Sequence, residues 1–214
     1  LSESRYPDGK IEVIYNGISL PSKKSSSLRE ELGLTDEFII FTMARYNPIK
    51  GLDFLLQSMY ELKKLADRPF KLVIAGDGEE KEKFFKKAEE MSLKENIISL
   101  GYRTDSANLL SGSDIYVNSS VSEALSFGIL EGISYGLPAV VSKVGGNTDI
   151  VNEETDLGFA VPYGDSKAFA KAIAELMNNK DLYNRMSKNA VKAAEEIFSR
   201  EIMMEKTFEI YSNN

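Results

Sequence analysis

Two basic side chains stand five residues apart in the segment MARYNPIKG, residues 43–51, and form a candidate phosphate site. Arg45 follows a short apolar run, and Lys50 comes just before Gly51 and a helical pattern. A guanidinium presents a planar fork to phosphate oxygens, whereas an ammonium acts as a compact point charge. The pair could neutralise a diphosphate without a divalent metal, although the spacing alone favours two solvated loop cations.

A second candidate site is the segment SEALSFGILEGISYGLP, residues 122–138. Glu123 precedes a predicted turn, and Glu131 lies inside the helix that is predicted to follow. A carboxylate such as Glu131 accepts hydrogen bonds from two neighbouring hydroxyls, which suits a ribose. The start of a helix attracts phosphate, because its first backbone N–H groups have no intrahelical acceptor. Here those N–H groups belong to Ser126, Phe127 and Gly128.

Other nucleotide-binding signatures are weak or missing. Gly76-Asp77-Gly78 resembles the opening of a dinucleotide fingerprint, but Lys81 stands where the third glycine should be. A tight turn between a strand and a helix explains these glycines better than an NAD site does. The sequence also lacks a P-loop motif, which excludes a P-loop phosphotransferase.

The composition excludes several kinds of chemistry. The 214 residues contain no His and no Cys, which rules out a histidine base, a thiolate nucleophile and a structural zinc site. The formal charge of −7 argues against a nucleic-acid partner, which requires a basic surface. No apolar run approaches the roughly 20 residues that cross a bilayer. We therefore expect a globular protein with neither a cofactor nor a metal ion.

Short apolar runs alternate with helical patterns along most of the chain. The runs predict buried strands at 11–15, 38–43, 70–75, 97–100, 115–117 and 139–142. This alternation predicts an α/β fold, a Rossmann-like doubly wound parallel sheet with helices on both faces. After Val161 it predicts a helical C-terminal tail over about 166–179, 181–197 and 200–211, with Asp181 and Ser199 as caps. In such sheets ligands bind beyond the carboxyl ends of the strands, where both candidate segments lie.

Five segments in a consistent order carry a specific resemblance to a known family. They read KIEVIYNGISL, MARYNPIKG, KLVIAGDGEE, IISLGY and SDIYVNSSVSEALSFGILEGISYGLPAVVSKVGG. Together they resemble the C-terminal, donor-binding domain of a retaining glycosyltransferase with the two-domain GT-B fold. The family includes glycogen synthase-like and sucrose synthase-like enzymes, and the resemblance covers almost the whole chain.

The resemblance implies a role for each matching residue. Arg45 and Lys50 would hold the donor diphosphate and stabilise the departing nucleoside diphosphate. Glu123 would contact hydroxyls of the transferred sugar and completes the expected catalytic set. Glu131 would bind the ribose, and Tyr102 would lie against the nucleobase. The other expected substrate-binding residues are Leu125, Ser126, Phe127, Gly128, Gly145 and Gly146.

The implied function is transfer of a hexosyl group from a nucleoside-diphosphate sugar, with retention of configuration and without a metal ion. Residues 1–214 would form a single donor-binding domain, and the N-terminal acceptor-binding domain of the same parent chain would lie outside them. The isolated domain would bind the sugar nucleotide without transferring the sugar. The implied location is the cytoplasm. The resemblance also allows peripheral association of the full-length protein with the inner face of the membrane.

Three other functions compete with this one. A sugar-nucleotide epimerase of the same fold would typically use a histidine, which is missing here. A non-catalytic sugar-nucleotide-binding or scaffold domain stays open as an alternative. A glycosidase acting through Glu123 and Glu131 is disfavoured, because eight residues of one helix separate two backbones by about 12 Å.

The sequence also departs from the family pattern. Ala44, Ala124 and Ser126 stand where glycines are usual, and Asn118-Ser119-Ser120 lacks the usual Pro-Ser. Because glycine reaches positive φ freely and alanine does not, the turn after Glu123 is expected to differ slightly. We interpret these differences as a sign of the donor sugar and not as a loss of function.

Overall fold

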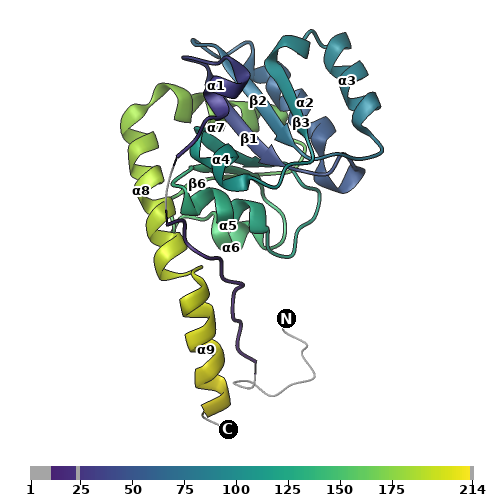
Figure 1. Ribbon diagram of the computed structural model, residues 1–214. Helices are drawn as coiled ribbons and strands as arrows, with labels where there is room; N and C mark the ends of the chain where they lie inside the picture. Colours follow the sequence, from purple (N-terminus) through teal and green to yellow (C-terminus); the bar gives the residue numbers. More distant parts are fainter. Residues whose placement is uncertain (1–10, 23–24, 213–214) are drawn as a thin grey trace.

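The fold is built on one parallel sheet, seen in the computed structural model, which describes residues 11–22 and 25–212 (Figure 1). The strands lie in the order β3-β2-β1-β4-β5-β6. Their bounds are β1 Phe38–Met43, β2 Phe70–Ala75, β3 Ile97–Gly101, β4 Ile115–Asn118, β5 Ala139–Ser142 and β6 Gly158–Val161. The chain runs outward from β1 to β3 and returns on the other side of β1, so the carboxyl ends of β1 and β4 form the topological switch point.

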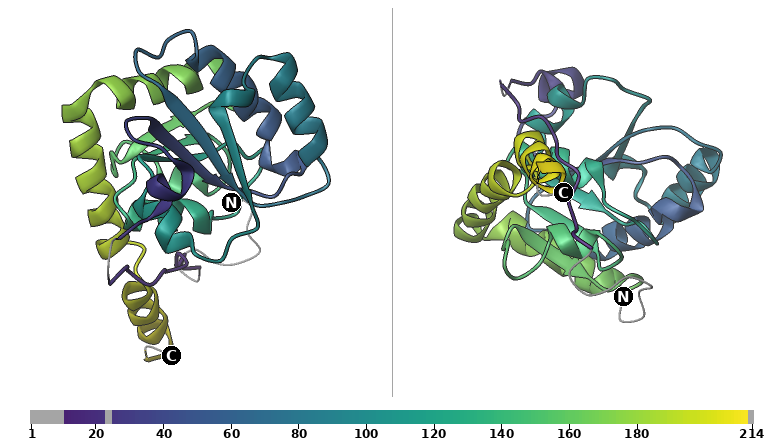
Figure 2. Two further views of the ribbon diagram at one scale, coloured as in Figure 1. Left: turned by 45° about the horizontal axis from the view of Figure 1, so that its top comes forward. Right: turned by 90° about the horizontal axis from the view of Figure 1, so that it is seen from below.

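Helices cover both faces of the sheet (Figure 2). One face packs against α2 (Leu52–Leu62), α3 (Lys81–Glu90) and α7 (Ser166–Asn178). The other packs against α1 (Leu28–Leu32), α4 (Ser106–Ser111), α5 (Phe127–Ser134) and α6 (Asn147–Ile150). Two 3-10 turns, η1 (Pro48–Lys50) and η2 (Lys94–Asn96), precede α2 and β3.

The strands are buried because successive side chains enter different cores. In β1, Phe38 and Ile40 belong to the core beneath α2 and α7, whereas Ile39 and Phe41 belong to the core beneath α5. Side chains that alternate in this way make both faces of a strand apolar, as a strand covered on both sides requires. The sheet confirms the predicted α/β class, and with it the doubly wound parallel arrangement.

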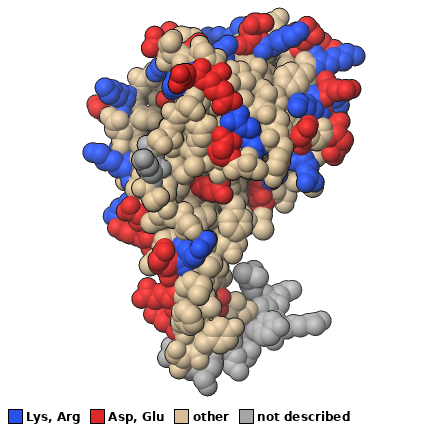
Figure 3. Space-filling view, viewed as in Figure 1, with Lys and Arg blue, Asp and Glu red and all other residues tan. Residues whose placement is uncertain are grey.

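The C-terminal helices run along the edge of the body and then leave it. Helix α8 (Lys180–Glu196) contributes Leu182 to one core and Ala190 to the other. Helix α9 (Arg200–Ser212) has no buried residue and projects from the body in Figure 1. Among the described residues no helix is both long and apolar enough to span a membrane. On the face shown in Figure 3, acidic and basic side chains are interspersed over the body.

The structure corrects two details of the predicted elements. Residues 11–15 do not form a strand: this segment is extended but unpaired, and only Ile18 bridges to Ser199. Lys10, the first residue of the matching segment, lies outside the described residues. Helix α8 is capped by Asn179, whose side chain accepts a hydrogen bond from the Leu182 N–H, and not by Asp181.

Most of the other predicted elements are present in the structure. Five of the predicted strands and all three C-terminal helices are present, and the Ser199 cap is confirmed, because Ser199 Oγ accepts from the Ile202 N–H at 3.3 Å. The strand β6 was not predicted. It completes the sheet beside β5.

Candidate functional site

The loop after β1 carries both predicted phosphate ligands and is held by local capping. Asn47 caps the turn η1, since its Oδ1 accepts a hydrogen bond from the Lys50 N–H at 3.1 Å. Pro48 occupies the first position of this turn, where its fixed φ suits a helix start. Gly51 then has a φ of 60°, in the left-handed region, and turns the chain into α2.

The same loop is fastened to the residues that follow β4. Ser119 Oγ donates to the Lys50 carbonyl at 2.8 Å, and the Val121 N–H donates to the Ile49 carbonyl at 2.8 Å. A Cβ at Gly51 would overlap the Ser119 carbonyl oxygen. The absence of a side chain therefore lets the two loops touch through their backbones at the switch point of the sheet.

The turn Gly76-Asp77-Gly78 packs against the backbone on either side of Arg45, at Ala44 and Tyr46. The Tyr46 N–H donates to the Asp77 carbonyl at 3.1 Å, and the Glu80 N–H donates to the Tyr46 carbonyl at 3.1 Å. Cβ atoms at the two glycines would overlap the backbone of Ala44 and Tyr46. These contacts support the reading of this segment as a structural turn.

Lys50 and Glu123 are in direct contact. Lys50 Nζ lies 2.5 Å from Glu123 Oε1, which also accepts hydrogen bonds from Ser120 Oγ at 2.7 Å and from Asn118 Nδ2 at 3.4 Å. Burial acts to raise the pKa of Glu123, but the hydrogen bonds from Lys50 and Ser120 outweigh it, so the pKa is lowered. Glu123 is therefore held ionised, and in this form both of its oxygens are hydrogen-bond acceptors.

Glu131 lies in the opposite electrostatic setting. It is half-buried on α5, and among the described residues its carboxylate has no hydrogen-bond or ion-pair partner. Burial raises its pKa. A half-buried carboxylate without a donor costs stability, and a ligand with neighbouring hydroxyls would supply the missing donors.

The start of α5 presents open donors between the two glutamates. The backbone N–H groups of Ser126, Phe127 and Gly128 have no acceptor among the described residues. Gly128 is small for a packing reason, because a Cβ there would overlap the hydroxyl of the buried Tyr116. Phe127 is half exposed, whereas Leu125 is partly buried against the core.

The glycine pair Gly145-Gly146 lies against the Glu123 segment. The Gly146 N–H donates to the Glu123 carbonyl at 3.2 Å. Cβ atoms at these positions would overlap the carbonyl oxygens of Glu123 and Ala124. The expected close passage of this loop is therefore present. Neither Ala124 nor Ser126 has a positive φ, so the missing glycines are accommodated without backbone strain.

The side chains of Arg45 and Tyr102 are both exposed. The Arg45 side chain is exposed and has no partner among the described residues, and Tyr102 is 81% exposed. Strand β2 separates β1 from β3, so the ends that carry these two residues are about 10 Å apart. The structure thus joins Lys50 to Glu123 and leaves Arg45, Tyr102 and Glu131 without contacts that link them to that pair.

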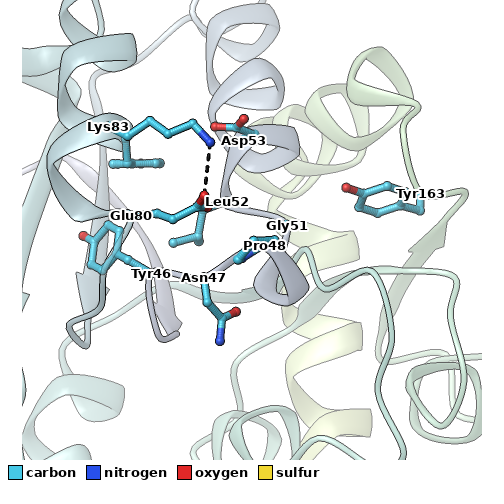
Figure 4. Close-up of a pocket in the computed structure, with 10 residues that line it drawn as sticks. Tyr46, Asn47, Pro48, Gly51, Leu52, Asp53, Glu80, Lys83 and Tyr163 are labelled. Carbon is cyan, nitrogen blue, oxygen red and sulfur yellow. Dashed lines mark hydrogen bonds and ion pairs between the residues drawn. The ribbon is translucent and has the colours of Figure 1, made fainter.

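A pocket of about 250 Å³ adjoins the loop after β1 (Figure 4). It is lined by Tyr46, Asn47, Pro48, Gly51, Leu52, Asp53, Glu80, Lys83, Phe84 and Tyr163. The charged groups at its rim are paired, Lys83 with Glu80 at 3.1 Å and Asp53 with Lys87 at 3.1 Å. None of the predicted catalytic residues lines it. The predicted site therefore lies outside this pocket, at the carboxyl ends of β1 and β4.

The sequence did not predict three buried polar residues near Glu123. Asn118 and Ser120 donate to its carboxylate, and Asn147 donates to Asn118. The Ser-x-x-Glu spacing was a usable sign for Ser120, because a serine three residues before a carboxylate can reach it within one turn. In the described part of the chain no group of three or more His, Cys, Asp or Glu residues is placed to hold a metal ion.

The opposite settings of the two glutamates predict opposite effects of neutralising them. A raised pKa means that the folded state favours the protonated form of Glu131, so stability falls as pH rises above the ordinary carboxyl pKa. The Glu131→Gln variant should then melt at a higher temperature than the unmodified chain at pH 7, and this difference should shrink as the pH is lowered. Calorimetry at pH 7 and at a pH near the ordinary carboxyl pKa checks the expectation.

Glu123→Gln is the matched comparison. Because its pKa is lowered, the stability that Glu123 contributes is present above the ordinary carboxyl pKa and is lost as pH falls. This variant should therefore melt at a lower temperature at pH 7. A shift in the same direction for both variants would contradict the electrostatic description of the site.

Two curated glycosyltransferases match most of this chain. Over 188 residues the chain is 36% identical to UDP-Gal:alpha-D-GlcNAc-diphosphoundecaprenol alpha-1,3-galactosyltransferase of Escherichia coli, covering 84% of this chain and 48% of that protein. Over 216 residues it is 27% identical to O-antigen chain mannosyltransferase C of Escherichia coli, covering 97% of this chain and 56% of that protein. The chain spans about half the length of the curated relatives it matches.

A solved structure shares the fold. Anabaena Alr3699/HepE, in complex with UDP and glucose, has a TM-score of 0.84 and 23% identity, covering 95% of this chain and 57% of that chain. The shared fold is the Rossmann-like domain of the GT-B type, as the resemblance implies. Residues 24–193 match the family described as glycosyl transferases group 1. The chain therefore belongs to the glycosyl transferases group 1 family.

Proposed function

We propose that this chain is the donor-binding half of a retaining glycosyltransferase and that it binds a nucleoside-diphosphate sugar. The observation that carries the proposal is the arrangement at the switch point. Two cations follow β1, two glutamates follow the adjacent β4, and Lys50 contacts Glu123. The E. coli relative is named for UDP-Gal, and the HepE structure is a complex with UDP and glucose, so we propose a UDP-hexose as the donor and UDP-galactose as the first to test.

In this proposal the cations act on the leaving group. Negative charge builds on the departing diphosphate during glycosyl transfer, and fixed cations aimed at that charge lower the barrier. Lys50 has three N–H donors, of which Glu123 takes one, so two remain for phosphate oxygens. The Arg45 side chain, which has no hydrogen-bond or ion-pair partner among the described residues, supplies a fork for the same group. Arg45 and Lys50 would thus neutralise the charge of the diphosphate without a metal ion.

The sugar and the ribose are assigned to the two glutamates. Glu131, half-buried without a donor, accepts from the ribose hydroxyls. Glu123 Oε2, which has no donor among the described residues, accepts from a hydroxyl of the hexose. Tyr102 lies at the end of β3, on the side of β1 away from Glu123, and is assigned to the base.

The acceptor is assigned to an N-terminal domain outside residues 1–214. The relatives are about twice as long as the matched region, which supports a second half of similar size. We further propose that the full-length protein works in the cytoplasm and meets its acceptor at the inner face of the membrane.

A thermal-shift series tests the proposed function. A ligand at about 100 times its Kd adds ~2.7 kcal/mol, which raises the melting temperature of a domain of this size by roughly 5–10 °C. We expect such a shift with UDP and UDP-galactose, and little shift with uridine, which lacks the diphosphate. The absence of a shift with UDP, GDP and ADP sugars at millimolar concentration would contradict the proposal.

A further inference from the structure

A buried network of side-chain amides lies behind Glu123. Asn118 is 7% exposed and ends β4, and Asn147 is fully buried at the start of α6. Asn147 Nδ2 donates to Asn118 Oδ1 at 3.3 Å and to the Ser142 carbonyl at 3.1 Å. The network therefore connects the ends of β4 and β5 with the loop Gly145-Gly146.

The orientation of the Asn118 amide is fixed by its partners. Its Oδ1 accepts from the Ser120 backbone N–H at 3.0 Å, a group that can only donate. The Asn147 amide adds a second donor to the same oxygen. Nδ2 of Asn118 must then face the other way, where it donates to Ser126 Oγ at 3.1 Å and Glu123 Oε1 at 3.4 Å.

As a result the two oxygens of Glu123 are not equivalent. Oε1 receives hydrogen bonds from Lys50, Ser120 and Asn118, which together fill its acceptor capacity. Oε2 receives none from the described residues. A carboxylate anchored through one oxygen presents the other in a fixed direction, as a binding site for a hydroxyl requires.

Packing alone gives no reason for an amide at Asn147. Its Oδ1 is buried and has no hydrogen-bond partner among the described residues. An unsatisfied buried acceptor costs stability that an apolar side chain of similar size would not cost. The amide is explained instead by the two hydrogen bonds that its Nδ2 donates.

We propose that Asn118 and Asn147 are positioning residues for sugar recognition, which fix the Glu123 carboxylate so that Oε2 meets a hydroxyl of the donor hexose. The inference rests on the proposed function and deepens it. These residues act on the sugar end of the donor, because the diphosphate is assigned to Arg45 and Lys50. Losing the network should therefore weaken the binding of UDP-galactose more than the binding of UDP.

Asn118→Asp is the most selective test. An aspartate keeps the oxygen that accepts from Ser120 and Asn147, and it replaces the nitrogen that donates to Ser126 and Glu123 by an oxygen of a second carboxylate. Asn118→Leu removes the same donor without adding charge, and it also removes the accepting oxygen. In both variants the ratio of the Kd for UDP to the Kd for UDP-galactose, measured by titration calorimetry, should fall about tenfold.

A control with matched chemistry is available on α8. Asn189 Nδ2 donates to the Asp156 carboxylate at 3.1 Å, so Asn189→Asp also sets one carboxylate against another, but Asp156 precedes β6 and does not lie at the carboxyl ends of the strands. This variant should lower the melting temperature and leave the affinity ratio unchanged. If the ratio stays unchanged in the two Asn118 variants, whether or not both affinities fall, the inference is overturned.

The unmodified chain separates failure of this inference from failure of the proposed function. If it binds neither UDP nor UDP-galactose, the proposed function is wrong and the inference falls with it. If it binds both with equal affinity, the nucleotide site stands, but Glu123 makes no favourable contact with the hexose and the positioning role is wrong.

Discussion

Replacing Arg45 by methionine is expected to weaken the binding of UDP by about 100-fold. A 100-fold loss corresponds to about 2.7 kcal/mol, which is within the range of about 1.5–3 kcal/mol that one hydrogen bond to a charged group contributes. The Arg45 side chain is exposed and has no hydrogen-bond or ion-pair partner among the described residues, so its replacement breaks no such interaction of the folded protein. The melting temperature without ligand should therefore stay unchanged. Titration calorimetry and a thermal melt of the same sample measure both quantities.

Arg68→Met is the control for this prediction. The Arg68 guanidinium donates to the Asp36 carbonyl at 2.8 Å, and both residues precede strands, at the opposite edge of the sheet. This substitution removes the same charge and should leave UDP affinity within about twofold. If Arg45→Met and Arg68→Met reduce the affinity equally, overall charge is responsible and the assigned phosphate contact is wrong.

Gly51→Ala is expected to reduce the free energy of unfolding by about 3 kcal/mol. A Cβ at this position would overlap the Ser119 carbonyl oxygen, and a backbone atom cannot move aside as a side chain can. The substitution would also force an L side chain to keep a φ of 60°. Since Gly51 follows Lys50 directly, the shift that relieves the overlap should displace Lys50 from Glu123 as well.

Gly33→Ala separates these two contributions. Gly33 has a φ of 64°, but nothing lies within 4 Å of a Cβ built on it. This variant should lose only about 1 kcal/mol, the cost of the left-handed conformation. Urea denaturation compares the two variants. An equal loss of stability would show that contact between the two loops contributes nothing.

The apolar pattern of the sequence predicts the inner strands of the sheet, which have a neighbouring strand on each side. The central strands β1, β2 and β4 are apolar on both faces, and their positions were predicted to within one residue. The segment 11–15 has a similar composition but no strand beside it, and Ile11 and Val13 are 53% and 63% exposed. An apolar run shows that a segment can form a strand, whereas pairing decides whether it does.

The strand β6 illustrates the reverse case. Its sequence Gly158–Val161 begins with glycine, contains an alanine and is only four residues long, so its local propensity for a strand is weak. It forms because four consecutive residues pair with β5, from Ala139 with Gly158 to Ser142 with Val161. Gly158 is also required there, since a Cβ would overlap the Ala139 carbonyl.

The charged residues of the candidate site could be predicted from the sequence, but the buried polar residues behind Glu123 could not. Arg45, Lys50, Glu123 and Glu131 are side chains whose chemistry can be inferred from type and from position after a strand. The contact of Lys50 with Glu123 follows from strand order, because β1 and β4 are neighbours. The amide pair Asn118 and Asn147 lies 29 residues apart in sequence, and only the fold shows that they meet.

A crystal structure of the chain with UDP-galactose would show whether the donor binds at the switch point of the sheet. We expect the diphosphate between Arg45 and Lys50, the ribose against Glu131 and the hexose against Glu123, at the carboxyl ends of β1 and β4. Binding of the nucleotide elsewhere, such as in the pocket between Glu80 and Tyr163, with Lys50 still directed only at Glu123, would contradict this expectation.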